Sequence, residues 1–392
     1  MKKKIAILGS TGSIGKTLIN IIKKDKKNFE LILLSADENY KELLKQAKNF
    51  KVQNLIITNV KSFNKLKKSK LPKNINIYND FSNFRKIFKK RIDYTMCSIS
   101  GIQGLKPTIE IIKYTNKIAI ANKESIICGW DLIEKRIKKY KTEFVPVDSE
   151  HFSIWSVIND FNVSDIERII LTASGGPFLN KKIRSNILPN DAVKHPNWVM
   201  GKKISIDSAT LMNKIFEIIE AKKIFNVDLK KFDILIHPKS YIHAIVKFKN
   251  GLIKIIAHDT NMKIPISNSI YLGEKKQNFI KSKKIDLNIL NSLNFQKINA
   301  KKFPVIKILK KITKKNSLFD TVLVSINDEL VDLFLNSKIK FSEISSKIWL
   351  LINLPFLSKF KHQKPKNLAQ IEKLNEFVRL KTRTLSVISK KK

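Results

Sequence analysis

Two carboxylates, Asp148 and Glu150, directly follow an apolar segment that has the pattern of a short buried strand, Glu143 to Val147. If the strand continues through residue 150, both side chains lie on one face, because residues two apart point the same way. Converging carboxylates repel each other, and a divalent cation between them relieves that repulsion. The alternative is a solvated loop with ordinary surface acids. The pair alone does not decide between the two.

A predicted helix supplies a third carboxylate and candidate anion ligands. Asp207 or Ser208 can cap its start, and an apolar pattern of helical spacing follows. Asn213, Lys214 and Glu217 then lie within about one turn of each other. A lysine and an amide near a serine-capped helix start suit a phosphate. Glu217 would complete a six-coordinate cation site together with the other two acids, substrate oxygens and water.

A glycine-rich turn near the N-terminus predicts a dinucleotide site. A short apolar strand, Ile5 to Leu8, leads into Gly9-Ser-Thr-Gly12-Ser-Ile-Gly15, and a helical pattern begins at about Thr17. Glycines let the backbone approach a pyrophosphate, and a helix N-terminus offers amides and a positive dipole end. A tight turn between strand and helix without any ligand is the alternative.

Polar residues also follow two other predicted strands. Asp37-Glu38-Asn39 follows the strand Glu30 to Ser35, where acids favour a free ribose 2′-hydroxyl and repel a 2′-phosphate. Asn122-Lys123-Glu124 follows an apolar strand that starts at Lys117. Ligands bind at the carboxyl edge of a parallel sheet, so Lys123 contacts either a cofactor or a structural polar partner.

Two further segments have the composition of a ligand-binding surface. Ser174 precedes Gly175 and Gly176 in a turn after a strand, and its neighbouring amides could form an anion nest. The loop Lys194 to Lys203 combines a His, a Trp, a Met and a Gly, which fits a lid that excludes water from a ligand. Alternatively, its Trp simply packs on the domain.

Composition narrows the class of protein. The formal net charge is +43, but the lysines are scattered among many Ile and Asn residues without a basic-aromatic module, which favours compositional drift over nucleic-acid binding. No apolar run reaches the ~20 residues of a membrane span. The chain enters a strand at once, so we expect no signal peptide and a cytoplasmic location. Two cysteines, Cys97 and Cys128, give neither a disulfide framework nor a zinc site.

The element pattern predicts an α/β protein with an N-terminal Rossmann-like dinucleotide-binding domain, a central α+β catalytic domain and a C-terminal helical bundle. The expected boundaries are 1–147 for the first domain, 148–272 for the catalytic domain, 273–297 for a connecting segment and 298–392 for the bundle.

Some local predictions concern structure and not chemistry. Asp80 to Arg91 has the pattern of a basic surface helix, and Met262 to Ile266 has that of a loop bearing an apolar contact. His237 and His243 fit satisfied core histidines better than ligands.

Taken together, these motifs resemble the 1-deoxy-D-xylulose 5-phosphate reductoisomerases of the non-mevalonate isoprenoid route. The likeness runs from Ile5 to about Phe341. The motifs that carry it are Gly9 to Gly15, Ala121 to Glu124, Pro146 to His151, Ser174 to Phe178, His195 to Trp198, and Asp207 to Thr210 with Asn213, Lys214 and Glu217.

The resemblance implies conversion of a sugar phosphate to 2-C-methyl-D-erythritol 4-phosphate by a homodimer, with no specific nucleic acid or membrane partner. It implies that Asp148, Glu150 and Glu217 hold Mg²⁺ or Mn²⁺, with Glu150 as the candidate proton shuttle. Substrate would be bound by Ser149, Ser174, His195, Trp198, Ser208, Asn213 and Lys214, with Trp198 and Met200 in the lid. NADPH would be bound by Thr11, Gly12, Ser13, Ile14, Asn39, Asn122, Lys123, Glu124 and Gly201.

The chain departs from the family pattern at three places. Asp37-Glu38 stands where the family commonly has Gly-Lys, which removes a cation expected near the 2′-phosphate and leaves the choice between NADPH and NADH open. Ile215-Phe216 replaces a usual Gly-Leu beside Glu217. His258, Thr260 and Asn261 replace a usual Gly, Pro and Asp.

Two rival functions follow from other features. A semialdehyde-dehydrogenase-like enzyme would need a thiolate beside a base, and neither cysteine has a His nearby in sequence. A basic nucleic-acid-binding protein without catalysis is the second rival.

Overall fold

The computed structural model describes residues 1–69, 71, 74–158, 161–181, 187–273 and 284–387. The chain forms two compact units. The first comprises Met1–Ile126, Leu132–Phe152 and Met262–Ser282, and the second Ile127–Asp131, Ser153–Asn261 and Lys283–Lys392. The predicted connecting segment 273–297 lies partly outside the described residues.

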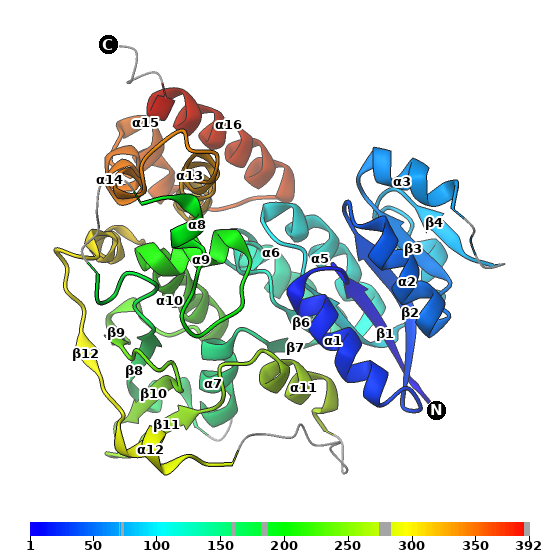
Figure 1. Ribbon diagram of the computed structural model, residues 1–392, viewed down its shortest axis with the longest axis horizontal. Coiled ribbons are helices and arrows are strands. Elements are labelled where there is room, and N and C mark those ends of the chain that lie inside the picture. Colours follow the sequence, from blue (N-terminus) through cyan, green and yellow to red (C-terminus); the bar gives the residue numbers. More distant parts are fainter. Residues whose placement is uncertain (70, 72–73, 159–160, 182–186, 274–283, 388–392) are drawn as a thin grey trace. The chain divides into compact units, whose positions relative to one another are not determined.

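The first unit is built on a seven-stranded sheet of order β4-β3-β2-β1-β5-β6-β7 (Figure 1). Every neighbouring pair in it is parallel. The strand order reverses beside β1, and ligands of such sheets bind at that reversal, outside the carboxyl ends of the strands. The strands are β1 (Lys3–Leu8), β2 (Phe29–Ala36), β3 (Asn54–Ile57), β4 (Asn76–Tyr78), β5 (Ile92–Cys97), β6 (Thr115–Ile120) and β7 (Glu143–Pro146).

A sheet covered on both faces has nearly continuous apolar strands, and β1 fits this because its last four residues are fully buried. Leu18, Leu43, Leu66 and Ile266, from four different helices, share one apolar core with the strands. The helices of this unit are α1 (Ser13–Lys24), α2 (Tyr40–Phe50), α3 (Val60–Lys67), α4 (Phe84–Ile87), η1 (Ile102–Gly104), α5 (Leu105–Ile111), η2 (Ile112–Tyr114), most of α6 (Lys123–Tyr140) and α11 (Lys263–Tyr271).

Two local predictions were wrong. Only the four residues of α4 are helical between Asp80 and Arg91, and Phe84 of α4 packs in a buried aromatic cluster, so the segment is not a basic surface helix. The expected loop around Met262 is the start of α11. Pro265 stands in the first turn of that helix, where a missing N–H breaks no helical hydrogen bond.

The second unit contains a five-stranded sheet of order β11-β10-β8-β9-β12, in which only β8 and β9 run parallel. The sheet places β11 at an edge. Its strands are β8 (Ile166–Ala173), β9 (Phe232–Ile236), β10 (Ile242–Phe248), β11 (Ile253–Ala257) and β12 (Gln296–Lys297).

Helices make up the rest of the second unit, and its last ninety or so residues are a helical bundle around α13, as predicted (Figure 1). The helices are most of α7 (Ser149–Ile158), η3 (Val163–Asp165), α8 (Pro189–Ala192), α9 (Lys202–Thr210), α10 (Met212–Phe225), η4 (Leu229–Lys231), α12 (Leu287–Asn291), η5 (Pro304–Lys311), α13 (Phe319–Leu335), α14 (Phe341–Ile352), α15 (Pro355–Ser358), η6 (Lys359–His362) and α16 (Leu368–Val387). Among the described residues, no helix combines the length and the apolar character needed to cross a membrane.

Candidate active site

Asp148 and Glu150 converge, but by a different geometry from the one predicted. β7 ends at Pro146, and α7 begins at Ser149, so Glu150 lies in the first turn of a helix and not on a strand. The amide of Phe152 donates to the carbonyl of Asp148 at 2.8 Å, which places Asp148 at the helix start. A carboxylate oxygen of Asp148 lies within 4.8 Å of one of Glu150. The hydroxyl of Ser149 donates to Glu150 Oε2 at 2.5 Å.

A buried lysine neutralises the first of these acids. Lys123 Nζ lies 2.8 Å from Asp148 Oδ2, with side-chain exposures of 8% and 17%. Two contacts were predicted as alternatives for Lys123, a cofactor or a structural polar partner. The structure shows a polar partner, the carboxylate of Asp148 in the first unit. His151 also offers a ring nitrogen within 4.8 Å of an Asp148 carboxylate oxygen. Sequence reasoning gave His151 no role, although its place three residues after Asp148, one helical turn away, is a usable signal.

The residues beside Lys123 serve the helix start. Asn122 caps α6, since its Oδ1 accepts from the amide of Ser125 at 2.5 Å and its Nδ2 donates to the carbonyls of Gly101, at 2.7 Å, and Ile99. Glu124 follows in the first turn of α6 and is buried. The segment thus fixes the turn after β5 to the end of β6, at the carboxyl edge of the sheet.

The glycine turn joins β1 to α1 tightly. α1 begins at Ser13, inside the motif and earlier than predicted. Gly9 has φ +87°, and a Cβ on Gly15 would lie 2.5 Å from Ser10 Cα, so neither position accepts a side chain. Gly12 occupies the N-cap without a side chain to cover the helix end. Thr11, Gly12, Ser13 and Ile14 therefore surround an uncovered helix N-terminus beside β1.

The acids after β2 are fixed by local contacts. Asn39 caps α2 by accepting from the amide of Glu42 at 3.2 Å. Asp37 accepts a hydrogen bond of 2.6 Å from the hydroxyl of Thr58. Asn39, a predicted cofactor contact, thus has a structural role.

In the second unit, Ser174 and His195 lie in contact, which the sequence did not predict. Their side chains form a hydrogen bond of 2.8 Å between Oγ and Nε2. His195 Nδ1 accepts from the amides of Asn197 and Trp198, at 3.1 and 3.0 Å, so the ring proton lies on Nε2 and is donated to Ser174. Desolvation lowers the pKa of His195 to about 4, so the ring is neutral at pH 7.

The segment after His195 has no regular structure but is tethered. Asn197 Nδ2 donates to the carbonyl of Pro238 at 2.6 Å and to Ser240 Oγ at 3.0 Å. The Trp198 ring meets His243 edge-on, with ring centroids 6.0 Å apart. Asn197 was not assigned a role from the sequence. Its place in a loop rich in special residues was the only signal.

The two histidines beyond this loop are core residues, as predicted. His237 Nδ1 lies 3.0 Å from the carbonyl of Asn294, and burial lowers its pKa. His243 contacts the carbonyl of His258 at 3.1 Å and stacks on the His258 ring.

The helix predicted after residue 208 is two helices. Asp207 and Ser208 do not cap a helix but lie inside α9. The N-cap residue of α9 is Gly201, with φ −64°. Leu211 adopts the left-handed conformation (φ +71°) and ends α9, and α10 begins at the next residue. The carbonyl of Ser208 would lie 2.9 Å from a Cβ on Gly176, so the turn after Ser174 packs against this helix end.

α10 carries the predicted cluster of Asn213, Lys214 and Glu217. Asn213 Nδ2 donates to Glu217 Oε1, and Lys214 Nζ forms an ion pair with Glu217 Oε2. The ion pair is nearly inaccessible to solvent. The two residues predicted to bind phosphate therefore lie directly beside the predicted metal ligand.

Comparison with known proteins gives the family. The family model of 1-deoxy-D-xylulose 5-phosphate reductoisomerase matches residues 5–129. The model of the 1-deoxy-D-xylulose 5-phosphate reductoisomerase C-terminal domain matches residues 144–225, and the model of the DXP reductoisomerase C-terminal domain matches residues 259–381. The 1-deoxy-D-xylulose 5-phosphate reductoisomerase of Pelagibacter ubique (strain HTCC1062) is 58% identical over 98% of this chain and 100% of its own length. The chain belongs to the 1-deoxy-D-xylulose 5-phosphate reductoisomerase family.

Solved structures of the reductoisomerase family share the fold. The Zymomonas mobilis enzyme in complex with NADPH has a TM-score of 0.87 and 29% identity, covering 98% of this chain and 99% of that one. A reductoisomerase in complex with NADPH, fosmidomycin and magnesium has a TM-score of 0.90 and 28% identity, covering 100% and 99%. The predicted family, fold class and enzyme class are confirmed.

The thiolate-dependent rival is excluded by burial. Cys97 and Cys128 are both buried, and desolvation raises the pKa of Cys97 to about 12 and that of Cys128 further still. Neither thiol can act as a nucleophile at neutral pH.

Proposed function

We propose that this chain converts 1-deoxy-D-xylulose 5-phosphate to 2-C-methyl-D-erythritol 4-phosphate, with NADPH as hydride donor and Mg²⁺ or Mn²⁺ as cofactor. The carboxylates of Asp148, Glu150 and Glu217 are the proposed ligands of the cation. The observation that carries the proposal is the convergence of Asp148 and Glu150 within 4.8 Å at the start of α7. Domain boundaries at residues 147, 272 and 297 remain part of the proposal.

The donor set fits a hard divalent ion. Carboxylate oxygens are the ligands that Mg²⁺ and Mn²⁺ prefer. Asp148 and Glu217 each have a lysine within ion-pair distance, Lys123 and Lys214, so each carboxylate lies beside a positive charge. When bound, the cation supplies a Lewis acid for the substrate's oxygens.

The first unit fits a dinucleotide. The uncovered N-terminus of α1 offers amides to a pyrophosphate, and Gly12 leaves it room to approach. Thr11, Ser13 and Ile14 flank that position, and NADPH supplies a hydride when bound. Asn39, Asn122, Lys123, Glu124 and Gly201 complete the proposed cofactor set. Of these, Asn39 and Asn122 would act by holding α2 and α6 in place.

The second unit fits the sugar phosphate. Lys214 supplies a cation and Asn213 an amide in the first turn of α10, and the hydroxyl of Ser174 lies beside the neutral ring of His195. Ser208, on α9, and Ser149 add hydroxyl groups. Glu150 accepts the Ser149 proton in a hydrogen bond, and this places it to move protons to and from substrate. Trp198 covers the bound substrate and excludes water.

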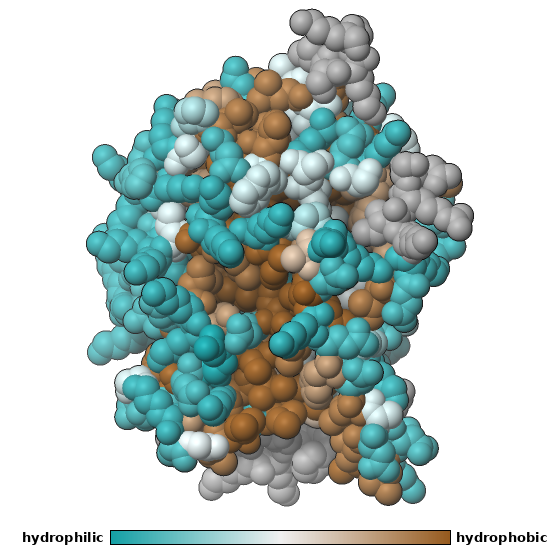
Figure 2. All heavy atoms as spheres, turned by 90° about the vertical axis from the view of Figure 1, so that its left-hand side faces the viewer, coloured by the Kyte–Doolittle hydropathy of each residue, from teal (hydrophilic) through white to brown (hydrophobic). Residues whose placement is uncertain are grey.

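The proposal includes a homodimer formed through the outer face of the second sheet. Ile255 pairs across to Ile245, and Ile245 pairs to Ile170, so three strands present isoleucines in one row. Ile253 and Ile255 are 53% and 55% exposed on the edge strand β11. Figure 2 shows an apolar area bordered by hydrophilic residues on this side of the molecule. An exposed patch of this kind marks an interaction surface, and a second copy is its proposed occupant.

The metal assignment is tested with Glu217→Gln and a control at another buried acid, Glu329→Gln. Glu329 lies on α13 and pairs with Arg379 and Arg383 of α16. We expect Glu217→Gln to abolish turnover and to weaken Mn²⁺ binding, measured by the electron paramagnetic resonance of free Mn²⁺, while nucleotide binding persists. The control should keep measurable turnover. Wild-type turnover in Glu217→Gln would refute the assignment.

A further inference from the structure

Two residues of α13 reach α9 through buried polar contacts. Asn327 Nδ2 donates to Asp207 Oδ1 at 2.8 Å. Lys203 Nζ lies 2.9 Å from Asp328 Oδ1 and 3.4 Å from Asp207 Oδ2. An amide and a carboxylate from the helical bundle thus contact a charged pair that lies one turn apart on α9.

Three of the four side chains are buried and Lys203 is 26% exposed, so breaking the contacts among the buried groups is costly. Asp207 is 1% exposed and Asn327 is fully buried. An ionised group out of water must keep its partners, and removing one partner leaves an uncompensated charge. The register of α9 against α13 is therefore held by specific geometry and not by apolar contact alone.

α9 is the element that carries the substrate-binding segment of the second unit. Lys203 lies two residues after Gly201, where the loop from His195 ends, and Asp207 directly precedes Ser208. The helix is also joined to that loop end, because Ser205 Oγ donates to the carbonyl of Gly201 at 3.1 Å. A shift of α9 therefore moves both the base of the loop and the Ser208 hydroxyl.

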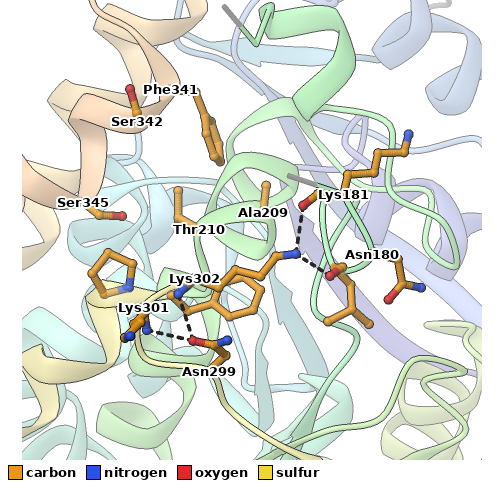
Figure 3. Close-up of a pocket in the computed structure, with 13 residues that line it drawn as sticks. Asn180, Lys181, Ala209, Thr210, Asn299, Lys301, Lys302, Phe341, Ser342 and Ser345 are labelled. Carbon is orange, nitrogen blue, oxygen red and sulfur yellow. Dashed lines mark hydrogen bonds between the residues drawn. The ribbon is translucent and has the colours of Figure 1, made fainter. Parts of the chain in front are cut away.

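The last turn of α9 borders a cavity on another side, although Ala209 and Thr210 are themselves buried. Ala209 and Thr210 line a cavity of about 780 Å³ together with Phe341 of α14 (Figure 3). Lys302 reaches into this cavity and donates to the carbonyls of Leu179 and, at 2.9 Å, Lys181. Side chains around an open space have fewer contacts to hold them. The contacts with α13 therefore carry more of the positioning of this turn.

We propose that Asn327 and Asp328 are positioning residues for the reductoisomerase reaction, which hold α9 so that Ser208 and the loop ending at Gly201 meet the sugar phosphate. The inference rests on the proposed function of Ser208. Its effect should appear in substrate affinity more than in the chemical step, because neither residue is placed at the reacting atoms.

The test compares Asp328→Asn and Asn327→Leu with Glu329→Gln. Glu329 lies on the same helix, is equally buried and pairs with Arg379 and Arg383 of α16, so its loss costs stability without touching α9. We expect Asp328→Asn and Asn327→Leu to raise KM for 1-deoxy-D-xylulose 5-phosphate roughly tenfold, with little change in kcat or in KM for NADPH. Amides 201–210 should exchange hydrogen faster in both variants. Asp328→Glu should restore part of the affinity.

Glu329→Gln should lower Tm by about as much as Asp328→Asn and Asn327→Leu do. It should leave the KM for 1-deoxy-D-xylulose 5-phosphate and the hydrogen exchange of residues 201–210 unchanged. Equal KM changes in all three variants, or unchanged exchange in Asp328→Asn, would overturn the inference. Ser208→Ala separates it from the proposed function. If Ser208→Ala keeps the wild-type KM, the substrate role of Ser208 fails, and the positioning of α9 is then judged by the exchange rates alone.

Discussion

Each acid that we assign to the cation already has a buried or half-buried neighbour of opposite charge or a hydrogen-bond donor. Lys123 pairs with Asp148, Ser149 donates to Glu150, and Lys214 pairs with Glu217. Each of these contacts fixes the position of a carboxylate oxygen. They also mean that a cation adds positive charge beside two lysines, so its binding affinity depends on them.

Lys123→Met should therefore separate stability from metal affinity. Without the ammonium, Asp148 is a buried charge lacking its partner, which costs on the order of 3 kcal/mol. Saturating Mn²⁺ should recover much of this, so the rise in Tm on adding Mn²⁺ should be larger in the variant than in the wild type. Lys117→Met is the control, since its 3.4 Å pair with Glu143 lies at a half-exposed acid. Equal Mn²⁺ effects in both variants would contradict the proposed role of Asp148.

The neutral His195 ring predicts a pH dependence of stability. Its pKa is about 4 in the folded chain and 6.5 ordinarily, so the unfolded state binds the proton more readily. The contribution of His195 to stability is full above pH 6.5 and is lost as the pH falls toward 4. The Tm difference between wild type and His195→Gln should shrink across that window in thermal melts. A difference that is constant or grows toward acid would show that His195 is protonated in the folded state.

Sequence reasoning reached these residues unevenly. Family likeness implied that Ser174 and His195 each bind substrate, and the structure also brings the two side chains into contact. Asp148 and Glu150 were predicted to converge along a strand, yet they do so because a helix starts between them. The partner of Lys123 could not be identified from the sequence, because that partner, Asp148, lies 25 positions away. Long-range pairing of charges leaves no periodic signal in one sequence.

At the scale of elements, apolar runs predicted the buried strands β1, β2, β6 and β7, whereas short strands such as β4 and β12 were not predicted. The breaks between helices were not predicted. Leu211 takes a left-handed conformation that a non-glycine residue adopts only when surrounding structure compels it, and nothing in its type announces this. The start of α11 was also missed, because its partner α1 lies some 250 residues earlier in the chain.

The turn between β1 and α1 gives a prediction that separates folding from nucleotide binding. A Cβ at Gly15 would overlap the backbone of Ser10, so Gly15→Ala should destabilise the protein by about 1–3 kcal/mol. A Cβ at Gly12 meets only the Gly9 carbonyl at 3.5 Å, so Gly12→Ala should leave the urea midpoint nearly unchanged. It should still weaken NADPH binding, because it fills the approach to the helix N-terminus. Unaltered NADPH affinity in Gly12→Ala, followed by cofactor fluorescence, would remove the pyrophosphate from this turn.

For the whole molecule, the net charge of +43 was interpreted as compositional drift, and this interpretation stays a prediction. The charge still has physical consequences. Two copies of so basic a chain repel each other, and salt screens that repulsion with a Debye length of about 10 Å at 0.1 M. Nonspecific binding to polyanions has the opposite salt dependence. Its affinity falls as salt rises, because the release of counterions favours binding most at low salt.

The proposed dimer can therefore be tested by salt and by one substitution. Apolar burial between the isoleucine rows is insensitive to screening while the repulsion weakens, so the dimer should tighten as salt rises from about 50 to about 500 mM. Ile255→Lys places a charge on the exposed edge strand of that face and should give monomers in sedimentation equilibrium at both salts. Val60→Lys, at a position 61% exposed on α3 of the first unit, should change neither. A dimer that dissociates with rising salt, or that survives Ile255→Lys unchanged, would mean that a different and polar surface joins the two copies.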